Sequence, residues 1–292
     1  IIMDDNINIF EQIKSDPDQI YLIAEIGINH NGDLGIAKRL IDASYACGWD
    51  CVKFQKRNPD ICVPEDQKNI LRMTPWGEMT YLEYKYRVEF ETDEYNEIDR
   101  YCKEKPMPWT VSVWDLDSLK FISDYNVPYI KIPSAHITNL SLIEETAKTK
   151  IPILISTGMS DWKMVDDAVE ILEKEATSYA ILHCNSTYPA PHDELNLNVL
   201  LEMQDRYDCL IGYSGHEYDL VPSQTAATLG AKIIERHVTL DHNMWGTDQS
   251  ASLEINAMDL LKKRLKDITQ MLGTREKFIT DSEKPVAKKL RG

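Results

Sequence analysis

The chain has 292 residues, of which 43% are hydrophobic, so it can bury one large core or two ordinary ones. Its formal net charge of −16 argues against binding to nucleic acid or to an anionic membrane, since both require clustered positive charge. No stretch approaches the roughly 18 consecutive apolar residues of a membrane span, and the N-terminus lacks signal-peptide charges, which together predict a soluble, cytoplasmic protein.

Short β-rich apolar runs alternate with helix-period segments from Tyr21 to about Met271. The predicted strands are Tyr21–Glu25, Cys51–Phe54, Trp109–Val113, Tyr129–Ile132, Ile153–Ser156, Ala180–His183, Leu210–Tyr213 and Lys232–Glu235. The predicted helices are Leu34–Cys47, Thr92–Lys103, Asp115–Tyr125, Leu140–Thr149, Asp161–Glu173, Asn198–Asp205, Leu220–Leu229 and Ala257–Leu272. This strict alternation predicts a single-domain α/β protein with a (β/α)8 TIM barrel, because doubly wound open sheets more often have fewer strands.

We expect the barrel to span residues 20–273, with an N-terminal arm at 1–19 and a C-terminal tail at 274–292. A long insertion, Lys56–Phe90, follows the second strand. Its aromatic and Met content favours a flap over the barrel mouth, and an irregular surface loop is the alternative. The six cysteines form no C-x-x-C pair and are expected to be reduced.

In a barrel of this kind the active site is built at the C-terminal ends of the strands. Every predicted strand ends in or just before residues that can bind a ligand or transfer a proton. In chain order these residues are Glu25, Lys53, Gln55, Thr110, Ser112, Lys131, Ser134, Ser156, Thr157, His183, Asn185, Ser186, Tyr188, Ser214, His216, Glu235, Arg236 and His237.

His216 and His237 lie 21 residues apart, each just past a predicted strand. That spacing is the length of one strand–helix–strand unit, which would place the two histidines at the same end of neighbouring parallel strands. The two imidazoles should therefore converge and form a divalent metal site. Glu25 could join them if the sheet closes, although either histidine alone would be read as an ordinary loop residue. Imidazole and carboxylate ligands suit Mn²⁺, Fe²⁺, Co²⁺ or Zn²⁺ better than Mg²⁺. A manganese-like ion is favoured, with Co²⁺ and Mg²⁺ as alternatives.

Lys53 and Lys131 lie inside otherwise apolar strands, where an ammonium group is costly to bury unless an anion neutralises it. With Ser134 and Ser156 they predict a pocket for a phosphate or carboxylate. The alternatives are that each lysine pairs with a carboxylate such as Glu25 or Glu235, or that one lysine forms a Schiff base.

Eight different short motifs are distributed along most of the chain. They are AEIGINHNGD at Ala24–Asp33, VKFQ at Val52–Gln55, KIPS at Lys131–Ser134, ISTGM at Ile155–Met159, LHCNSTYPAP at Leu182–Pro191, GYSGH at Gly212–His216, IERHVT at Ile234–Thr239 and GTDQSASLE at Gly246–Glu254. As an ordered set they resemble the sialic acid synthase family, the phosphoenolpyruvate-condensing N-acetylneuraminate synthases with their legionaminate and pseudaminate relatives.

The resemblance implies a barrel that condenses phosphoenolpyruvate with an open-chain aldose, giving a 3-deoxy-2-keto sugar acid and phosphate by C–O cleavage. It implies that His216 and His237 hold a metal that polarises the sugar aldehyde, and that the enzyme is a homodimer. The residues implied for phosphoenolpyruvate are Lys53, Lys131, Ser134, Ser156, Ser186 and Ser214, and those for the sugar or metal-bound water are Glu25, Gln55, Tyr188 and Asp248. Thr110 and Asn185 are further substrate-binding candidates, and catalytic roles are expected for Glu25, Lys53, Lys131, His136 and Asp248.

Three features depart from the family pattern. His136 stands where members usually place an acidic residue, two positions after the serine of Lys-x-x-Ser, and GTDQ replaces the usual turn around Asp248. The sequence also ends about where the linker to a small antifreeze-like domain would begin, which leads us to expect an acceptor without an N-acyl group or a shorter sugar.

Two other functions fit the same residues. One is a pyruvate-dependent aldolase or lyase of the same barrel class, which would release no phosphate. The other is a non-catalytic sugar-phosphate sensor, which is favoured only by His136.

Overall fold

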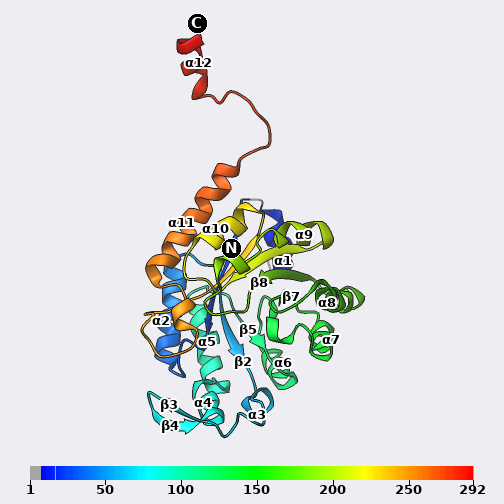
Figure 1. Ribbon diagram of the computed structural model, residues 1–292, viewed down its shortest axis with the longest axis vertical. Helices are drawn as coiled ribbons and strands as arrows, with labels where there is room; N and C mark the ends of the chain where they lie inside the picture. Colours follow the sequence, from blue (N-terminus) through cyan, green and yellow to red (C-terminus); the bar gives the residue numbers. More distant parts are fainter. Residues whose placement is uncertain (1–7, 17, 292) are drawn as a thin grey trace.

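The computed structural model describes residues 8–16 and 18–291 and contains a closed barrel of eight parallel strands (Figure 1). The strand order around the barrel is β1-β10-β9-β8-β7-β6-β5-β2. The strands are β1 Tyr21–Gly27, β2 Cys51–Lys56, β5 Trp109–Val113, β6 Ile130–Ile132, β7 Ile153–Ser156, β8 Tyr179–Cys184, β9 Leu210–Gly215 and β10 Ile233–His237. The predicted single-domain (β/α)8 barrel is therefore confirmed.

The first and last strands are neighbours, which brings the ends of distant segments together. β1 pairs with β10 in a register that sets Glu25 opposite His237, and with β2 in a register that sets Glu25 opposite Lys53. Six of the eight strands differ from the predicted ranges by one or two residues at one or both ends, and only β5 and β7 match them. Among the differences, β6 begins after Tyr129 and β10 runs through His237 rather than ending at Glu235. The extension matters because it puts His237 on the barrel wall rather than in a loop.

Helices cover the outside of the barrel and bury apolar faces against the strands. They are α2 Leu34–Ala46, α5 Thr92–Glu104, α6 Leu116–Ile122, α7 Leu140–Lys148, α8 Trp162–Lys174, α9 Val199–Arg206, α10 Val221–Thr228 and α11 Ile255–Leu272. In α8, for example, Val165, Ala168, Val169 and Leu172 recur at helical spacing and are all buried. None of the helices among the described residues is both long and apolar enough to cross a membrane. All six cysteines are free thiols, as expected.

The insertion after β2 is ordered and lies at the C-terminal end of the barrel (Figure 1). It contains α3 Pro59–Cys62, the hairpin β3 Leu71–Thr74 and β4 Gly77–Thr80, and α4 Tyr81–Val88. Its end is fixed to the β1–α2 loop, because the His30 ring stacks on Phe90 at 3.9 Å and Gly32 packs against the Arg87 carbonyl. Gly32 has φ +71°, and a Cβ there would lie 2.2 Å from that oxygen, so only glycine fits. The insertion is thus structured rather than irregular.

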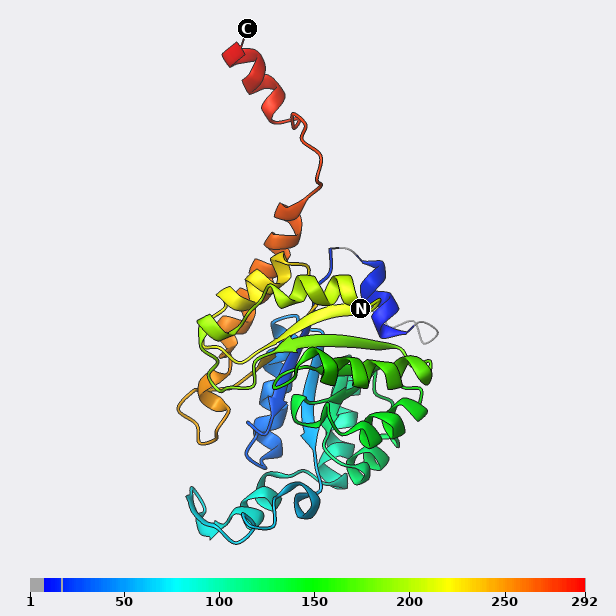
Figure 2. The ribbon, with the colours of Figure 1, turned by 45° about the vertical axis from the view of Figure 1, so that its right-hand side comes forward.

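The opposite end of the barrel is closed by α1, Ile9–Ser15 (Figure 2). Ile9, Phe10 and Ile13 are buried and share a cluster with strand residues such as Tyr21 and Ile23 of β1. The described part of the N-terminal arm, 8–16 and 18–19, therefore packs on the barrel, and the rest of that predicted arm lies outside the described residues. Beyond α11, helix α12 at Glu283–Arg291 buries no side chain and projects from the barrel (Figures 1 and 2).

Candidate active site

All eight strands contribute to a cavity of about 220 Å³ at the C-terminal end of the barrel. It is lined by Glu25, Lys53, Gln55, Ser112, Trp114, Lys131, Pro133, Ser134, Ala135, Ser156, Met159, Cys184, Ser186, Tyr188, Ser214, His216, Glu235 and His237. The local reason is strand geometry: alternate side chains face the same side, so Glu235 and His237 both point inward while Arg236 points out. Eleven of the fifteen site residues predicted from the sequence meet in this cavity.

A buried chain of alternating charges crosses the floor of the cavity. Lys53 Nζ lies 2.7 Å from Glu25 and 3.7 Å from Glu235, and Lys131 Nζ lies 3.0 Å from Glu235. In this structure, which contains no ligand, the lysines therefore pair with Glu25 and Glu235, as one of the alternatives from the sequence predicted. Two cations and two carboxylates balance each other here, which offsets much of the cost of burying them.

The two carboxylates of this chain differ in acidity. Burial alone would raise the pKa of Glu235, but the ammonium groups of Lys131 and Lys53 lower it to about 2. Burial raises the pKa of Glu25, and the neighbouring Glu235 adds to that effect while Lys53 opposes it. Glu25 is therefore the less acidic of the two carboxylates and the better suited of the pair to proton transfer as a general acid or base. Its Oε1 accepts a hydrogen bond from Gln55 Nε2 at 2.8 Å.

The two histidines face each other with ring centroids 5.4 Å apart. His216 Nδ1 lies 2.6 Å from the Asn185 carbonyl, so Nδ1 carries the proton and Nε2 accepts from the Tyr188 hydroxyl at 2.9 Å. His237 Nδ1 is buried without a hydrogen-bond partner among the described residues and lies 3.8 Å from Asp248 Oδ2. Burial lowers the pKa of His237 to about 3, so its ring is neutral at pH 7.

This donor set fits a divalent metal with open coordination positions. Two imidazole rings converge beside carboxylates, and His237 Nδ1 has no hydrogen-bond partner among the described residues. In the part of the chain that the structure describes, no three His, Cys, Asp or Glu side chains are already gathered at metal-binding distance. Solvent or substrate would therefore have to supply the remaining ligands.

Hydroxyl and amide groups converge on the opposite wall, at the ends of β6, β7 and β8. Gly158 N donates to Ser134 Oγ at 3.0 Å, and a Cβ on Gly158 would lie 2.1 Å from Ser186 Oγ. Ser156 Oγ is buried and has no hydrogen-bond partner among the described residues. Close backbone approach and an unused hydroxyl beside Lys131 form a cradle for an anion.

Four predicted site residues lie outside the cavity lining. Thr110 Oγ1 donates to the Tyr129 carbonyl within the barrel wall, and His136 packs edge-on against Trp114 at 5.2 Å. Asn185 acts on His216 through its backbone carbonyl, and Asp248 approaches the cavity only through His237.

Sequence reasoning also passed over several lining residues. Glu235 was named as a strand-end residue and as a possible lysine partner but was given no role in the site, and Trp114 and Cys184 were not singled out. The sequence pattern could have found them, because each lies two positions from a residue that was predicted at a strand end and therefore lies on the same face of its segment.

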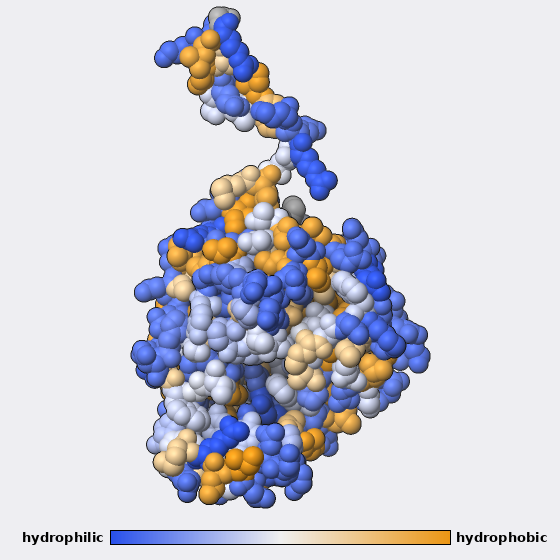
Figure 3. Space-filling view, in the orientation of Figure 1, coloured by the Kyte–Doolittle hydropathy of each residue, from blue (hydrophilic) through white to orange (hydrophobic). Residues whose placement is uncertain are grey.

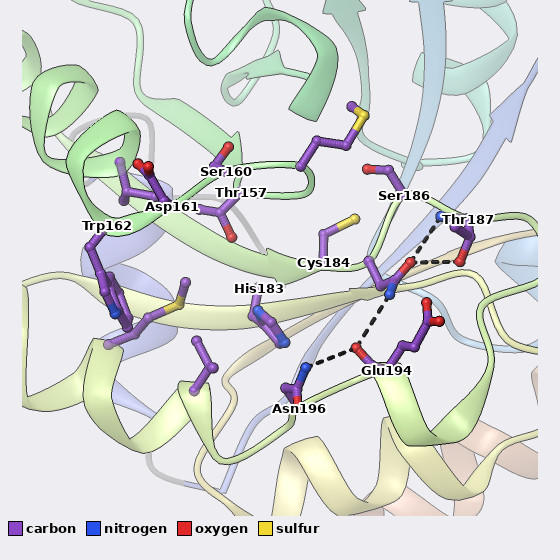
Figure 4. A pocket seen from close by; sticks show the side chains of 15 residues that line it. Thr157, Ser160, Asp161, Trp162, His183, Cys184, Ser186, Thr187, Glu194 and Asn196 are labelled. Atoms are coloured by element: carbon purple, nitrogen blue, oxygen red, sulfur yellow. Dashed lines mark hydrogen bonds between the residues drawn. The ribbon is translucent and has the colours of Figure 1, made fainter.

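A second cavity of about 650 Å³ adjoins the first and shares Met159, Cys184 and Ser186 with it (Figure 4). It lies between the β7–α8 loop and the segment around Glu194 and Asn196. Its lining includes Asp161 and Glu194, and no Lys or Arg is found among the described residues there. This cavity is therefore suited to neutral or polar groups rather than to anions.

Comparison with known proteins agrees with this geometry. Residues 40–277 match the NeuB family. The chain is 37% identical to the N-acetylneuraminate-9-phosphate synthase of Homo sapiens over 92% of its own length and 76% of that protein. It is 34% identical to the N,N'-diacetyllegionaminic acid synthase of Campylobacter jejuni, over 90% of this chain and 80% of the relative. The crystal structure of an N-acetylneuraminic acid synthetase from Leptospira borgpetersenii in complex with citrate superposes with a TM-score of 0.84 at 27% identity, covering 94% of this chain and 93% of that one. The chain belongs to the NeuB family, and these matched relatives are synthases of sialic-acid-type sugars.

Proposed function

We propose that the protein condenses phosphoenolpyruvate with an open-chain aldose to give a 3-deoxy-2-keto sugar acid and inorganic phosphate. One observation carries the proposal: a single cavity holds an anion cradle on one wall and a pair of facing imidazoles on the other. The names of the relatives, which are synthases of N-acetylneuraminate 9-phosphate and of diacetyllegionaminic acid, support the same reaction class.

Phosphoenolpyruvate is the anion that this cradle suits. Its phosphate and carboxylate would take the place of the internal carboxylates as partners of Lys53 and Lys131. The Ser134, Ser156 and Ser186 hydroxyls would donate to its oxygens, with Ser214 at the end of β9 completing the set. Placed donors of this kind stabilise the charge that moves to phosphate as it departs.

His216 and His237 would hold a divalent metal, with Mn²⁺ favoured and Co²⁺ or Mg²⁺ as alternatives. Such an ion would supply Lewis-acid polarisation of the aldehyde carbonyl. The protein itself orients the donor nitrogens: the Asn185 carbonyl fixes the tautomer of His216, and burial keeps His237 neutral.

Carbon 3 of phosphoenolpyruvate forms a bond to the aldehyde carbon, the aldehyde oxygen takes a proton to become a hydroxyl, and positive charge is left at carbon 2. Water adds to carbon 2 and loses a proton, and the tetrahedral intermediate then breaks the C2–O bond and expels phosphate. Glu25 is the group in the cavity whose raised pKa suits it to accept or return that proton. We do not assign this task to His136, because it packs on Trp114 outside the lining.

The test follows inorganic phosphate in the presence of Mn²⁺ and a panel of N-acetylmannosamine, mannose, arabinose and their phosphates. With phosphoenolpyruvate labelled by ¹⁸O at the bridging position, we expect the label in the released phosphate, since the C–O bond breaks. Consumption of pyruvate without phosphate release would identify an aldolase instead. His216→Ala and His237→Ala should abolish turnover, as should chelation of the metal. A protein that binds these ligands but turns over none of them would be the sensor.

A further inference from the structure

Two residues adjacent to the facing histidines form an ion pair that the reaction proposed above does not use. Glu217 directly follows His216, and Arg236 directly precedes His237. Arg236 Nη1 lies 2.9 Å from Glu217 Oε1, and both side chains have an exposed fraction of 0%. Alternate residues of β10 face opposite sides, so Arg236 points away from the barrel interior that Glu235 and His237 face. The pair therefore lies on the outer side of the strands that carry the two histidines.

The ion pair is out of reach of a ligand. Neither Arg236 nor Glu217 is among the described residues that line the two cavities. Hydrophilic surface surrounds the hollow between the insertion and the barrel body (Figure 3), whereas this pair lies inside the protein. Any effect of the pair on the reaction must therefore pass through the residues to which it is attached.

Arg236 holds the segment that follows His216 at several points. Its guanidinium donates to the backbone carbonyls of Glu217 and Asp219, the latter at 2.9 Å. The Glu217 carboxylate also accepts a hydrogen bond from the Tyr213 hydroxyl of β9 at 2.9 Å. Because these contacts involve backbone as well as side-chain atoms, they fix the course of the chain immediately after His216.

The end of β9 leaves room for this carboxylate. A Cβ at Gly215 would lie 2.6 Å from both oxygens of the Glu217 carboxylate and 2.8 Å from a ring carbon of Tyr213. A side chain at position 215 would therefore push the carboxylate away from Arg236. Glycine at the end of the strand allows the ion pair to form.

The pairing between β9 and β10 ends just before the two histidines. The last pair in the register is Arg236 with Gly215, so the next positions along the two strands are His237 and His216. On its other side His237 is held by β1, where it pairs with Glu25. The ion pair thus connects β9 to β10 at the level where their backbone register stops.

A fully buried ion pair is an inefficient way to stabilise a fold. The cost of removing both charges from water often exceeds their attraction, and apolar replacements of similar volume are often as stable. Such a pair does favour one arrangement of the two segments, because separating the charges leaves each of them buried and unpaired. In the described part of the chain, no three His, Cys, Asp or Glu side chains are gathered to hold a metal. The affinity for an ion therefore depends strongly on how the two imidazoles are oriented.

We propose that Glu217 and Arg236 are positioning residues for the metal site, and that their ion pair sets the separation and orientation of His216 and His237. The inference rests on the proposed function, in which these two histidines hold a divalent ion. Outer residues that orient metal ligands typically contribute about 10- to 100-fold to metal affinity. The ion pair should contribute a factor of this size without contacting the ion or a substrate.

Calorimetry measures the Kd of Mn²⁺ without substrate and the Kd of phosphoenolpyruvate without metal. Glu217→Gln keeps the shape of the side chain but removes its charge, and should raise the Kd of Mn²⁺ about 10-fold or more. The Kd of phosphoenolpyruvate should be unchanged, because the anion cradle lies on the opposite wall. Glu89→Gln is the matched control, since Glu89 forms another buried ion pair, with Lys56 at 3.3 Å, and should leave both constants unchanged.

Two further variants separate position from stability. Glu217→Leu combined with Arg236→Met replaces the ion pair by apolar side chains, and should keep the free energy of unfolding while the Kd of Mn²⁺ stays raised. Tyr213→Phe removes only the hydroxyl contact to Glu217 and should raise that Kd by a smaller factor, about 3-fold. If the folded double variant bound Mn²⁺ as tightly as the unaltered protein, the pair would serve stability alone and the inference would be wrong.

His216→Ala distinguishes failure of this inference from failure of the proposed function. If Glu217→Gln bound Mn²⁺ normally while His216→Ala lost it, the histidines would hold the metal and the ion pair would not position them. If the unaltered protein bound no Mn²⁺, or His216→Ala bound it equally well, the metal site itself would be refuted and this inference with it. Equal losses of Mn²⁺ and phosphoenolpyruvate affinity in Glu217→Gln would show a general structural role instead.

Discussion

At the level of single residues, the cavity contains polar atoms that the protein does not satisfy. Ser156 Oγ and His237 Nδ1 are both buried without a hydrogen-bond partner among the described residues. A buried polar atom in that state costs roughly 1–3 kcal/mol. A ligand that supplies the missing hydrogen-bond partner would remove this cost. A binding residue therefore gains its partner from the ligand, whereas a structural residue already has one in the protein.

Ser156→Ala tests that distinction. Removing an unpartnered hydroxyl should leave the free energy of unfolding unchanged or slightly increased, while the KM for phosphoenolpyruvate rises about 10-fold for the loss of one charged hydrogen bond. Denaturant unfolding and steady-state kinetics measure the two effects. Ser44→Ala is the control, because Ser44 Oγ bonds to the Leu40 carbonyl in α2 and should leave that KM unaltered. A stability loss without a change in KM would mark Ser156 as structural.

Among the elements, the insertion between β2 and α5 stands out because aromatic contacts attach it to a distant part of the chain. Trp245 meets Trp76 at 5.7 Å and Tyr84 at 5.0 Å, both edge-on, and its carbonyl accepts from Asn31 Nδ2 at 2.8 Å. Each such aromatic pair contributes about 0.5–1.5 kcal/mol beyond area burial. The insertion is therefore held over the mouth by a few contacts that a single substitution can remove.

Trp245→Ala should release the insertion and leave the barrel folded. We expect faster limited proteolysis within residues 56–90 and a KM for the sugar that rises more than the KM for phosphoenolpyruvate. Met73→Ala, at an exposed position of the hairpin, is the control and should change neither. Equal protease resistance in Trp245→Ala and the unaltered protein would show that other contacts hold the insertion.

For the molecule as a whole, acid stability depends on histidines that the fold buries in neutral form. His30 is 3% exposed, its Nδ1 accepts from Gly32 N at 3.1 Å, and burial lowers its pKa to about 3. The unfolded chain binds a proton near the ordinary histidine pKa of about 6.5, whereas the folded chain does not. This contribution to stability is complete above that pH and is lost progressively as the pH falls towards 3.

The resulting loss from His30 alone is about 2 kcal/mol between pH 8 and pH 5. His30→Phe keeps the stacking on Phe90 but cannot bind a proton, so its free energy of unfolding should fall by about 2 kcal/mol less over the same interval. Urea unfolding at the two pH values measures the difference, whatever constant offset the lost hydrogen bond adds. His192→Phe alters an exposed histidine and should retain the full decrease. If the free energy of unfolding of His30→Phe fell between the two pH values by as much as that of the unaltered protein, His30 would have to be protonated in the folded protein.

Much of this architecture could be predicted from the sequence, because period and spacing are local properties. Alternating apolar runs and helical segments predicted eight units, and side chains such as Lys53, Ser214 and His216 were predicted at the strand ends where the cavity forms. Two-residue periodicity could also have placed Glu235 in the site, since it shares a face with His237.

Other features depend on contacts between distant segments, and only the tertiary structure decided them. The different acidities of Glu25 and Glu235 arise because Lys131 reaches across the barrel to one carboxylate and not to the other. The position of Arg57 behind Trp114, and of α4 beneath Trp245, likewise follows from packing between segments far apart in the chain. Sequence periodicity determines which way a side chain faces, whereas its electrostatic partners are determined by closure of the barrel.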